Sequence, residues 1–219
     1  MELTKQNILL VKNESFTSNT YLLVNELKQC IIIDPGLDFS LIHYAIQKNG
    51  LTPLAILSTH GHFDHIGSVD ELKIQYKIPF YLHNIDKKLC ASVNFYLKIA
   101  KINILKKSPV PDFLFQNQRE NVFIGGFDIE VYNLPGHTDG SCVFKIGSNL
   151  FSGDLVYKKG LGLNNFPGEN IAKLKSSILQ FSNLFNKNDI IYPGHGASGC
   201  LKIFFNENND LKSFLNSNL

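Results

Sequence analysis

The feature that most constrains this chain is the stretch LSTHGHFDHIG, Leu57 to Gly67, which places four potential metal ligands within six positions. They are His60, His62, Asp64 and His65, in a chain with only seven histidines. His60 and His62 are two residues apart, so on extended backbone both imidazoles face the same way. Two such nitrogens, with a third from elsewhere in the chain, form a neutral ligand set suited to zinc or iron.

The cluster follows a predicted strand and precedes a predicted helix. LAILS, Leu54 to Ser58, is short and apolar, which indicates a buried strand. Ser68 and Glu71 match a capping box, so a helix is expected from near Ser68 to about Lys77. The cluster should therefore lie on the loop after a strand, where α/β proteins place their catalytic and binding residues.

The rest of the chain alternates between apolar strand-like segments and amphipathic helical ones. No linker or low-complexity tract separates its two parts, so we expect one domain over residues 1–219, of α/β class, with two sheets inside and helices outside. Strands are expected at 7–11, 20–24, 30–34, 54–58, 79–83, 121–125, 127–134, 142–147, 149–154 and 189–193. Helices are expected before Gly50, at 68–77, at 85–102, at 169–185 and after Gly199, with a loop at 106–113.

Three further predicted strands end at a histidine or an aspartate. VYNLPGHT leads to His137, NLFSGD to Asp154 and DIIYPGHG to His195. Pro-Gly before a histidine makes a sharp turn that directs the imidazole to the sheet edge. Asp64 and His65 face a position next to that of the first histidines, and Asp154 is placed to bridge two ions.

These residues predict a centre for two divalent metal ions, with zinc expected and iron or manganese as alternatives. Two cations acting on one water lower its pKa enough to leave hydroxide near pH 7. Asp64 and Asp154 are the predicted catalytic carboxylates. The predicted ligands are His60, His62, Asp64, His65, His137, Asp154 and His195.

The remaining candidates have two interpretations each. His43 and His83 are expected to be ordinary helix and strand histidines. Asp34, in the turn DPG, either supports a metal ligand or only forms the turn. Three hydroxyls close to ligands either support them or are solvated; they belong to Thr59, Thr138 and Ser152.

Composition and charge exclude some partners. The net charge of +2 gives no electrostatic footprint for nucleic acid or an anionic membrane. The four cysteines form no C-x-x-C pair and are expected to be reduced, mostly buried thiols. The N-terminal residues do not read as a signal peptide, and no apolar run approaches the roughly 18 residues that span a bilayer. We therefore expect a cytoplasmic protein with a small-molecule substrate.

In this order, THGHFDH, PGHT, SGD and PGHG resemble the metallo-β-lactamase superfamily over about residues 7 to 200. Their spacing is most similar to that of its small glyoxalase II-like (hydroxyacylglutathione hydrolase-like) hydrolases. The resemblance implies a four-layer αββα sandwich with a binuclear metal site at one sheet edge. It also implies a ligand assignment: His60, His62 and His137 for the first metal; Asp64, His65 and His195 for the second; and Asp154 as the bridge.

Some members of the superfamily fit less well. The best-known zinc β-lactamases carry Cys at the position of Asp154, so antibiotic hydrolysis is not expected. Flavodiiron proteins carry Glu in place of His62, and the nucleases carry an added domain or a long RNA-binding arm. Glyoxalase II-like proteins usually have a basic residue where this chain has Leu163, and often Tyr or Asp where it has Asn165. The C-terminal helical domain of full-length glyoxalase II is also absent.

The function implied is that of a metal-dependent thioester hydrolase that uses a metal-bridging hydroxide. A glutathione carrier is not expected to be preferred, although Lys158 and Lys159 could compensate for Leu163. The alternatives are an iron persulfide dioxygenase, with one iron held by two His and one Asp, and a lactonase. A purely structural metal site is disfavoured, because structural zinc needs only four ligands and closes its coordination shell.

Overall fold

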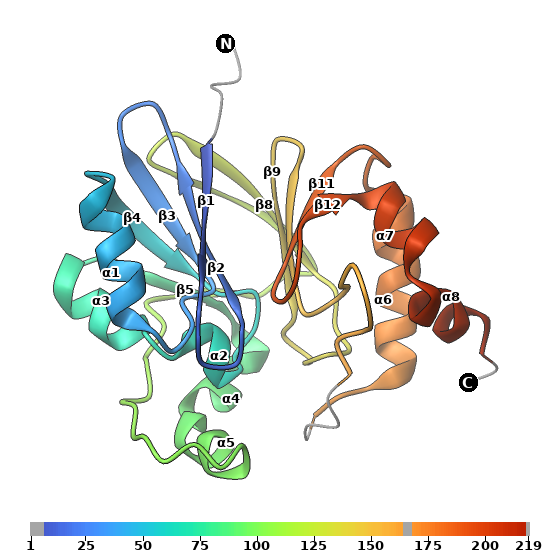
Figure 1. Cartoon of the computed structure of the whole chain (residues 1–219), viewed down its shortest axis with the longest axis horizontal. Helices are drawn as coiled ribbons and strands as arrows, with labels where there is room; N and C mark the ends of the chain where they lie inside the picture. Colours follow the sequence, from blue (N-terminus) through green and yellow to red (C-terminus); the bar gives the residue numbers. More distant parts are fainter. Residues whose placement is uncertain (1–6, 164–167, 218–219) are drawn as a thin grey trace.

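The computed structural model describes residues 7–163 and 168–217, which form two six-stranded sheets with helices on their outer faces (Figure 1). The first half of the chain contains β1 (Asn7–Lys12), β2 (Asn19–Val24), β3 (Gln29–Ile33), α1 (Phe39–Lys48), β4 (Thr52–Leu57), α2 (Phe63–Ile66), α3 (Val69–Tyr76), β5 (Phe80–His83), a 3₁₀ turn (Asn84–Asp86), α4 (Lys87–Ala91), α5 (Val93–Ile99) and β6 (Phe113–Phe115). The second half contains β7 (Arg119–Ile124), β8 (Phe127–Asn133), β9 (Cys142–Ile146), β10 (Asn149–Gly153), α6 (Ile171–Leu184), β11 (Ile190–Pro193), β12 (Gly199–Cys200), α7 (Leu201–Glu207) and α8 (Asn209–Asn216).

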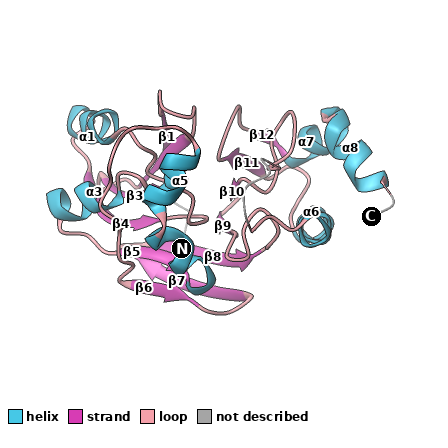
Figure 2. Ribbon diagram, turned by 90° about the horizontal axis from the view of Figure 1, so that it is seen from below, coloured by secondary structure: helices cyan, strands magenta, loops and turns pink. Residues whose placement is uncertain are grey.

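Each sheet is mixed. In the first, of order β1-β2-β3-β4-β5-β6, the pairs β1–β2 and β2–β3 are antiparallel and the others parallel. In the second, of order β12-β11-β10-β9-β8-β7, only β10–β11 is parallel. Helices α1 and α3 lie outside the first sheet and α6, α7 and α8 outside the second, as the view from below also shows (Figure 2).

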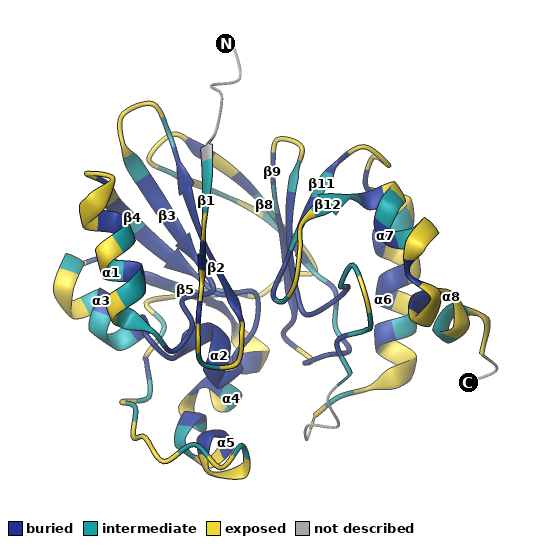
Figure 3. Cartoon of the chain, viewed as in Figure 1, coloured by how far each residue is buried: buried dark blue, intermediate teal, exposed yellow. Residues whose placement is uncertain are grey.

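The central strands β2, β3, β9 and β10 are buried on both faces, which explains their continuous apolar runs, whereas residues of the edge strand β7 alternate between exposed and partly buried. In β3, Cys30 and Ile32 face the helices of the first half, whereas Ile31 and Ile33 pack between the two sheets. A third apolar cluster joins the second sheet to its own helices. Figure 3 shows the result, with buried strands inside and exposed faces on the outer helices. The predicted four-layer αββα architecture is confirmed.

Several local predictions were wrong. The helix expected over 85–102 is divided into α4 and α5 at Ser92, whose hydroxyl donates a 2.9 Å hydrogen bond to the Lys88 carbonyl and so competes with the helical ladder. Helix α3 begins next to Ser68 as expected, but the Ser68 side chain makes no capping bond. Its backbone (φ −101°, ψ 5°) is not extended as a capping residue requires, because α2 ends only two residues earlier. Strands β6 and β12 were not predicted.

The topology brings the ends of several strands to one edge of the sandwich. The chain leaves β3, β4, β8, β10 and β11 near this edge, where α2 also lies (Figure 1). No helix in the described part of the chain is long and apolar enough to cross a membrane.

Candidate metal centre

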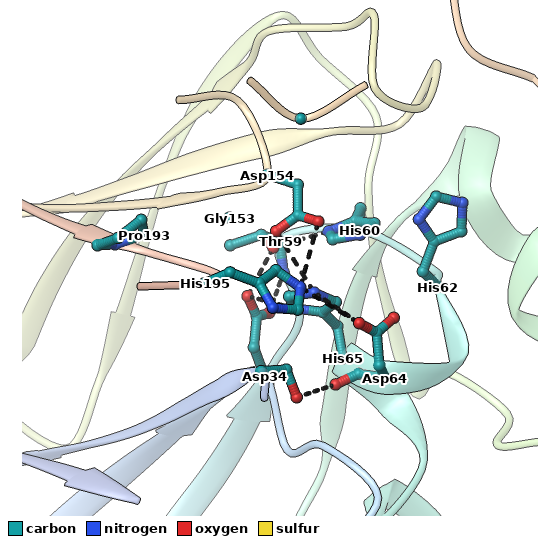
Figure 4. A network of polar contacts seen from close by, with 12 residues as sticks. Asp34, Thr59, His60, His62, Asp64, His65, Gly153, Asp154, Pro193 and His195 are labelled. Carbon is teal, nitrogen blue, oxygen red and sulfur yellow. Dashed lines mark hydrogen bonds and ion pairs between the residues drawn. The ribbon is translucent and has the colours of Figure 1, made fainter. Parts of the chain in front are cut away.

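All seven predicted ligands lie together at this edge, although they come from both sheets (Figure 4 shows six of them). His60, His62, Asp64 and His65 follow β4, with the last two in the short helix α2. The loops after β8, β10 and β11 carry His137, Asp154 and His195. Six of the seven side chains are buried and His195 is partly exposed, so the centre opens to solvent on the His195 side.

Three histidines form a first group. Single nitrogens of His60, His62 and His137 all lie within 4.8 Å of one another, close enough to share one ion. His62 Nδ1 and His137 Nε2 are 2.9 Å apart. The group joins the loop after β4 of the first sheet to the loop after β8 of the second.

A second group consists of Asp64, His65 and His195, again with one ligand atom each within 4.8 Å. Asp64 Oδ2 lies 3.3 Å from His195 Nε2 and 3.7 Å from His65 Nε2. This group contains a carboxylate, so it offers a charged site beside the neutral first one.

Asp154 lies between the two groups. Its Oδ2 is 3.5 Å from His137 Nε2 in the first group and 3.6 Å from His195 Nε2 in the second. Its Oδ1 is 3.4 Å from His65 Nε2. One carboxylate thus faces both sets of imidazole nitrogens, as a bridging ligand would.

Three of the histidines use one ring nitrogen to contact a supporting oxygen and direct the other toward the centre. His65 Nδ1 lies 3.1 Å from Asp34 Oδ2, His137 Nδ1 2.8 Å from the Gly162 carbonyl, and His60 Nδ1 3.1 Å from Thr59 Oγ1. Among the described residues, His60 Nε2, His65 Nε2 and Asp154 Oδ1 are buried with no hydrogen-bond partner. Buried polar atoms are rarely left unpaired, so these atoms fit ligation of divalent cations.

Asp34 fixes the orientation of this network. Its carboxylate accepts bonds of 2.7 Å from both the backbone N–H and the hydroxyl of Thr59, in addition to the contact with His65. Because the Thr59 hydroxyl gives its hydrogen to Asp34, it can only accept from His60 Nδ1–H, and His60 Nε2 keeps its lone pair. Asp34 has a left-handed backbone (φ 52°), which is uncommon outside glycine. Of the two interpretations, the structure favours support of the ligands.

Burial and charge act differently on the two groups. Burial and the neighbouring histidines lower the pKa of His60 well below its usual value, and burial with the nearby His137 lowers that of His62 to about 3. Burial also disfavours the charged form of His65, but Asp154, Asp64 and Asp34 outweigh it and raise the pKa of His65 to about 10. His60 and His62 therefore favour the neutral form that ligates a metal, whereas His65 would have to give up a proton to do so.

Glycine is required next to two of the histidines. Gly136, before His137, has φ 141°, and a Cβ there would collide with the backbone of Leu174 in α6. A Cβ on Gly194, before His195, would collide with Asp154 Oδ1 and His65 Cε1. The Pro-Gly-His motifs thus permit the close approach of each loop to the centre.

Two cavities adjoin the centre and share Tyr157 and His195. One, of about 300 Å³, is lined by Phe16, His62, Phe63, Asp64, Asp154, Tyr157 and His195. The other, of about 390 Å³, is lined by Tyr157, Lys158, Lys159, His195, Gly196 and Ala197. Leu163 instead packs against the apolar cluster under the second sheet, and Asn165 lies outside the described residues.

The other candidates are placed as follows. His43 contacts Tyr76 Oη at 2.7 Å and His83 accepts a bond from the Ile85 N–H; neither belongs to a metal-ligating group. The Ser152 hydroxyl donates to the Gly153 carbonyl, whereas the Thr138 hydroxyl donates to Asp86. The four cysteines are free thiols, three of them buried.

Sequence reasoning missed two residues near the centre. Tyr157, three residues after Asp154, has a buried hydroxyl that lies near the Asp154 carboxylate. Burial and the carboxylate of Asp154 raise its pKa well above 10, so the hydroxyl keeps its proton. Asp86, in the 3₁₀ turn after β5, bonds to both histidine loops. The spacing after SGD could have suggested Tyr157, but Asp86 has no sequence signal.

The αββα fold and this histidine–aspartate cluster define a class of proteins that bind divalent metals at the edge of a two-sheet sandwich. The family model of the metallo-beta-lactamase superfamily matches residues 14–195. The chain belongs to this superfamily.

Its relatives include named hydrolases. The chain is 36% identical over 183 residues to the probable metallo-hydrolase YqgX of Bacillus subtilis, covering 82% of this chain and 85% of the relative. It is 31% identical to the hydroxyacylglutathione hydrolase GloC of Haemophilus influenzae, covering 87% and 91%. The crystal structure of the B3 metallo-beta-lactamase BLEG-1 matches with a TM-score of 0.87 and 29% identity, over 94% of this chain and 99% of that one.

Proposed function

We propose that this protein is a two-metal hydrolase that cleaves small thioesters. The observation that carries the proposal is the position of Asp154, whose carboxylate lies within 3.6 Å of imidazole nitrogens from both ligand groups, while the buried His60 Nε2 and His65 Nε2 have no hydrogen-bond partner. The identity of the relative GloC as a hydroxyacylglutathione hydrolase supports a thioester as substrate.

In this proposal one ion would be held by His60, His62 and His137. The other would be held by Asp64, His65 and His195, and Asp154 would serve both positions. When bound, two divalent cations supply a water of lowered pKa as nucleophile and stabilise negative charge on a substrate oxygen. Zinc suits the ligand set, because imidazole and carboxylate are among its usual ligands; the same donors also accept iron.

Tyr157 provides a hydrogen-bond donor for the proposed reaction, in addition to the metal ions. Tyr157 lines both cavities, its hydroxyl keeps its proton, and its ring centroid lies 5.7 Å from that of His195. It can therefore donate a hydrogen bond to a substrate oxygen that gains negative charge during attack on the carbonyl. A thiolate leaving group needs no proton, so no further acid is required on the other side.

Metal stoichiometry together with a substrate panel tests the proposal. Protein purified without chelator should contain about two metal ions per chain and hydrolyse thioesters faster than lactones of the same acyl size. One iron per chain, with oxygen uptake on addition of a persulfide, would instead establish the dioxygenase alternative.

β-Lactam hydrolysis is a second candidate, because BLEG-1 carries that name and aligns over nearly the whole chain. A chromogenic cephalosporin included in the same panel distinguishes the two activities. A kcat/KM for the cephalosporin above that of every thioester would replace the first proposal by the second.

A further inference from the structure

Asp86 joins the two loops that carry the first histidine group. Its Oδ2 accepts a 2.9 Å bond from the N–H of Gly61, the residue between His60 and His62. The same oxygen accepts a 2.7 Å bond from the hydroxyl of Thr138, the residue after His137. Its Oδ1 accepts a 2.9 Å bond from the N–H of Gly140.

The carboxylate is well placed for this role. Asp86 is 2% exposed, so its three bonds are shielded from competing water. A Cβ on Gly140 would collide with the Asp86 carboxylate, which shows how closely the loop that carries His137 approaches Asp86. His83, at the end of β5, also lies near Asp86, and burial lowers the pKa of its imidazole.

Asp34 and Asp86 support different metal ligands. Asp34 bonds to His65 directly and to His60 through Thr59. Asp86 contacts no ligand side chain through a hydrogen bond, and acts on the backbone around His60, His62 and His137. It comes from a different part of the first half, 21 residues after His65.

We propose that Asp86 is a positioning residue that sets the spacing between the His60–His62 pair and His137, and so controls the affinity of the first metal position selectively. This inference rests on the two-ion centre proposed above. Removal of a group that orients metal ligands lowers metal affinity about 10- to 100-fold in other proteins. We expect a loss of that size at the first position and little change at the second.

The test compares zinc affinity in two backgrounds. His195→Ala removes a ligand of the second group and leaves the first intact, whereas His137→Ala does the reverse. Asp86→Asn is introduced into each, and the zinc dissociation constant of metal-free protein is measured by competition with a chromophoric chelator. We expect Asp86→Asn to weaken binding about 10- to 100-fold in the His195→Ala background and less than about threefold in the His137→Ala background.

Two further variants control for general loss of structure. Asp189→Asn alters another buried carboxylate, which accepts a bond from the Asn186 N–H at the far end of β11, and should change zinc affinity in neither background. Thr138→Val removes one of the three donors and should cause a smaller loss, again only in the His195→Ala background. It also serves as the test if Asp86→Asn does not fold.

Equal weakening in both backgrounds, or none in the His195→Ala background, would overturn the inference. If the wild-type protein contains only one metal ion per chain, the two-ion proposal is overturned rather than the role of Asp86. The zinc affinity measured in the His195→Ala background would still decide that role.

Discussion

Asp34→Asn is the most informative single substitution outside the ligand set. It removes a charge without changing the shape of the side chain. Asparagine also tolerates the left-handed backbone found at this position, where φ is 52°, so backbone strain should not contribute to the result. Alanine would add strain and is the poorer choice.

The size of the effect follows from the number of acceptors. The carboxylate accepts from Thr59 N–H with Oδ1, and from the Thr59 hydroxyl and His65 Nδ1 with Oδ2. An amide offers one oxygen, so at least one of these donors must face an NH₂ group and lose its bond. Hydrogen bonds to charged groups contribute about 1.5–3 kcal/mol each, and a lost group that orients a ligand costs about 10- to 100-fold in metal affinity, or roughly 1.4–2.7 kcal/mol.

The loss should fall on the ion that His65 ligates. If the NH₂ faces His65, the ring can recover a bond only by moving its proton to Nε2, the atom that points into the centre. The assay is a titration of metal-free protein with zinc against a competing chelator, with thermal unfolding of the metal-free form as the control for folding. Retention of both ions within about threefold of the wild-type affinity would refute the reasoning.

Three other substitutions test the centre and its surroundings. Asp154→Ala should lose activity and at least one metal ion by elemental analysis while its circular dichroism spectrum is unchanged, because the core does not depend on the site; full activity would exclude Asp154 from the mechanism. Tyr157→Phe should lower kcat about 10- to 100-fold at constant metal content, as expected for one lost bond to a charged oxygen, and an unchanged kcat would show that the hydroxyl does not contact the reacting atoms. Lys158 and Lys159 are partly or fully exposed, so each should contribute at most about 1 kcal/mol to binding of an anionic carrier. The kcat/KM for lactoylglutathione should therefore exceed the kcat/KM for the same acyl group on a neutral thiol by less than about thirtyfold. A preference above a hundredfold that disappears in the Lys158→Ala, Lys159→Ala double variant would contradict this estimate.

The long apolar strands and the histidine loops could be predicted from sequence because their signals are local. Buried strands read as short apolar runs, and Pro-Gly-His and Ser-Gly-Asp at their ends mark sharp turns at a sheet edge. Asp86 could not be predicted, since it becomes significant through contacts with Gly61, Thr138 and Gly140, which lie 25, 52 and 54 residues away in the sequence. The short strand β6 depends on its pairing with β5, which its own sequence does not indicate. The division of the helix at Ser92 is a local effect of the Ser92 hydroxyl, which the apolar periodicity of the segment does not reveal.

The ligands of each group are contributed by loops from both sheets, and this has a consequence for how the protein behaves when metal is scarce. An ion bound there would act as a crosslink between the two halves, and binding to the native state alone stabilises it by RT ln(1 + [L]/Kd), about 2.7 kcal/mol at a free metal concentration 100 times Kd. Without metal, the loops after β4, β8 and β11 would lose that crosslink, and we expect them to open more readily. Metal depletion would then make the chain more susceptible to proteolysis at this edge, so that cellular abundance as well as catalytic rate would follow the supply of the ion.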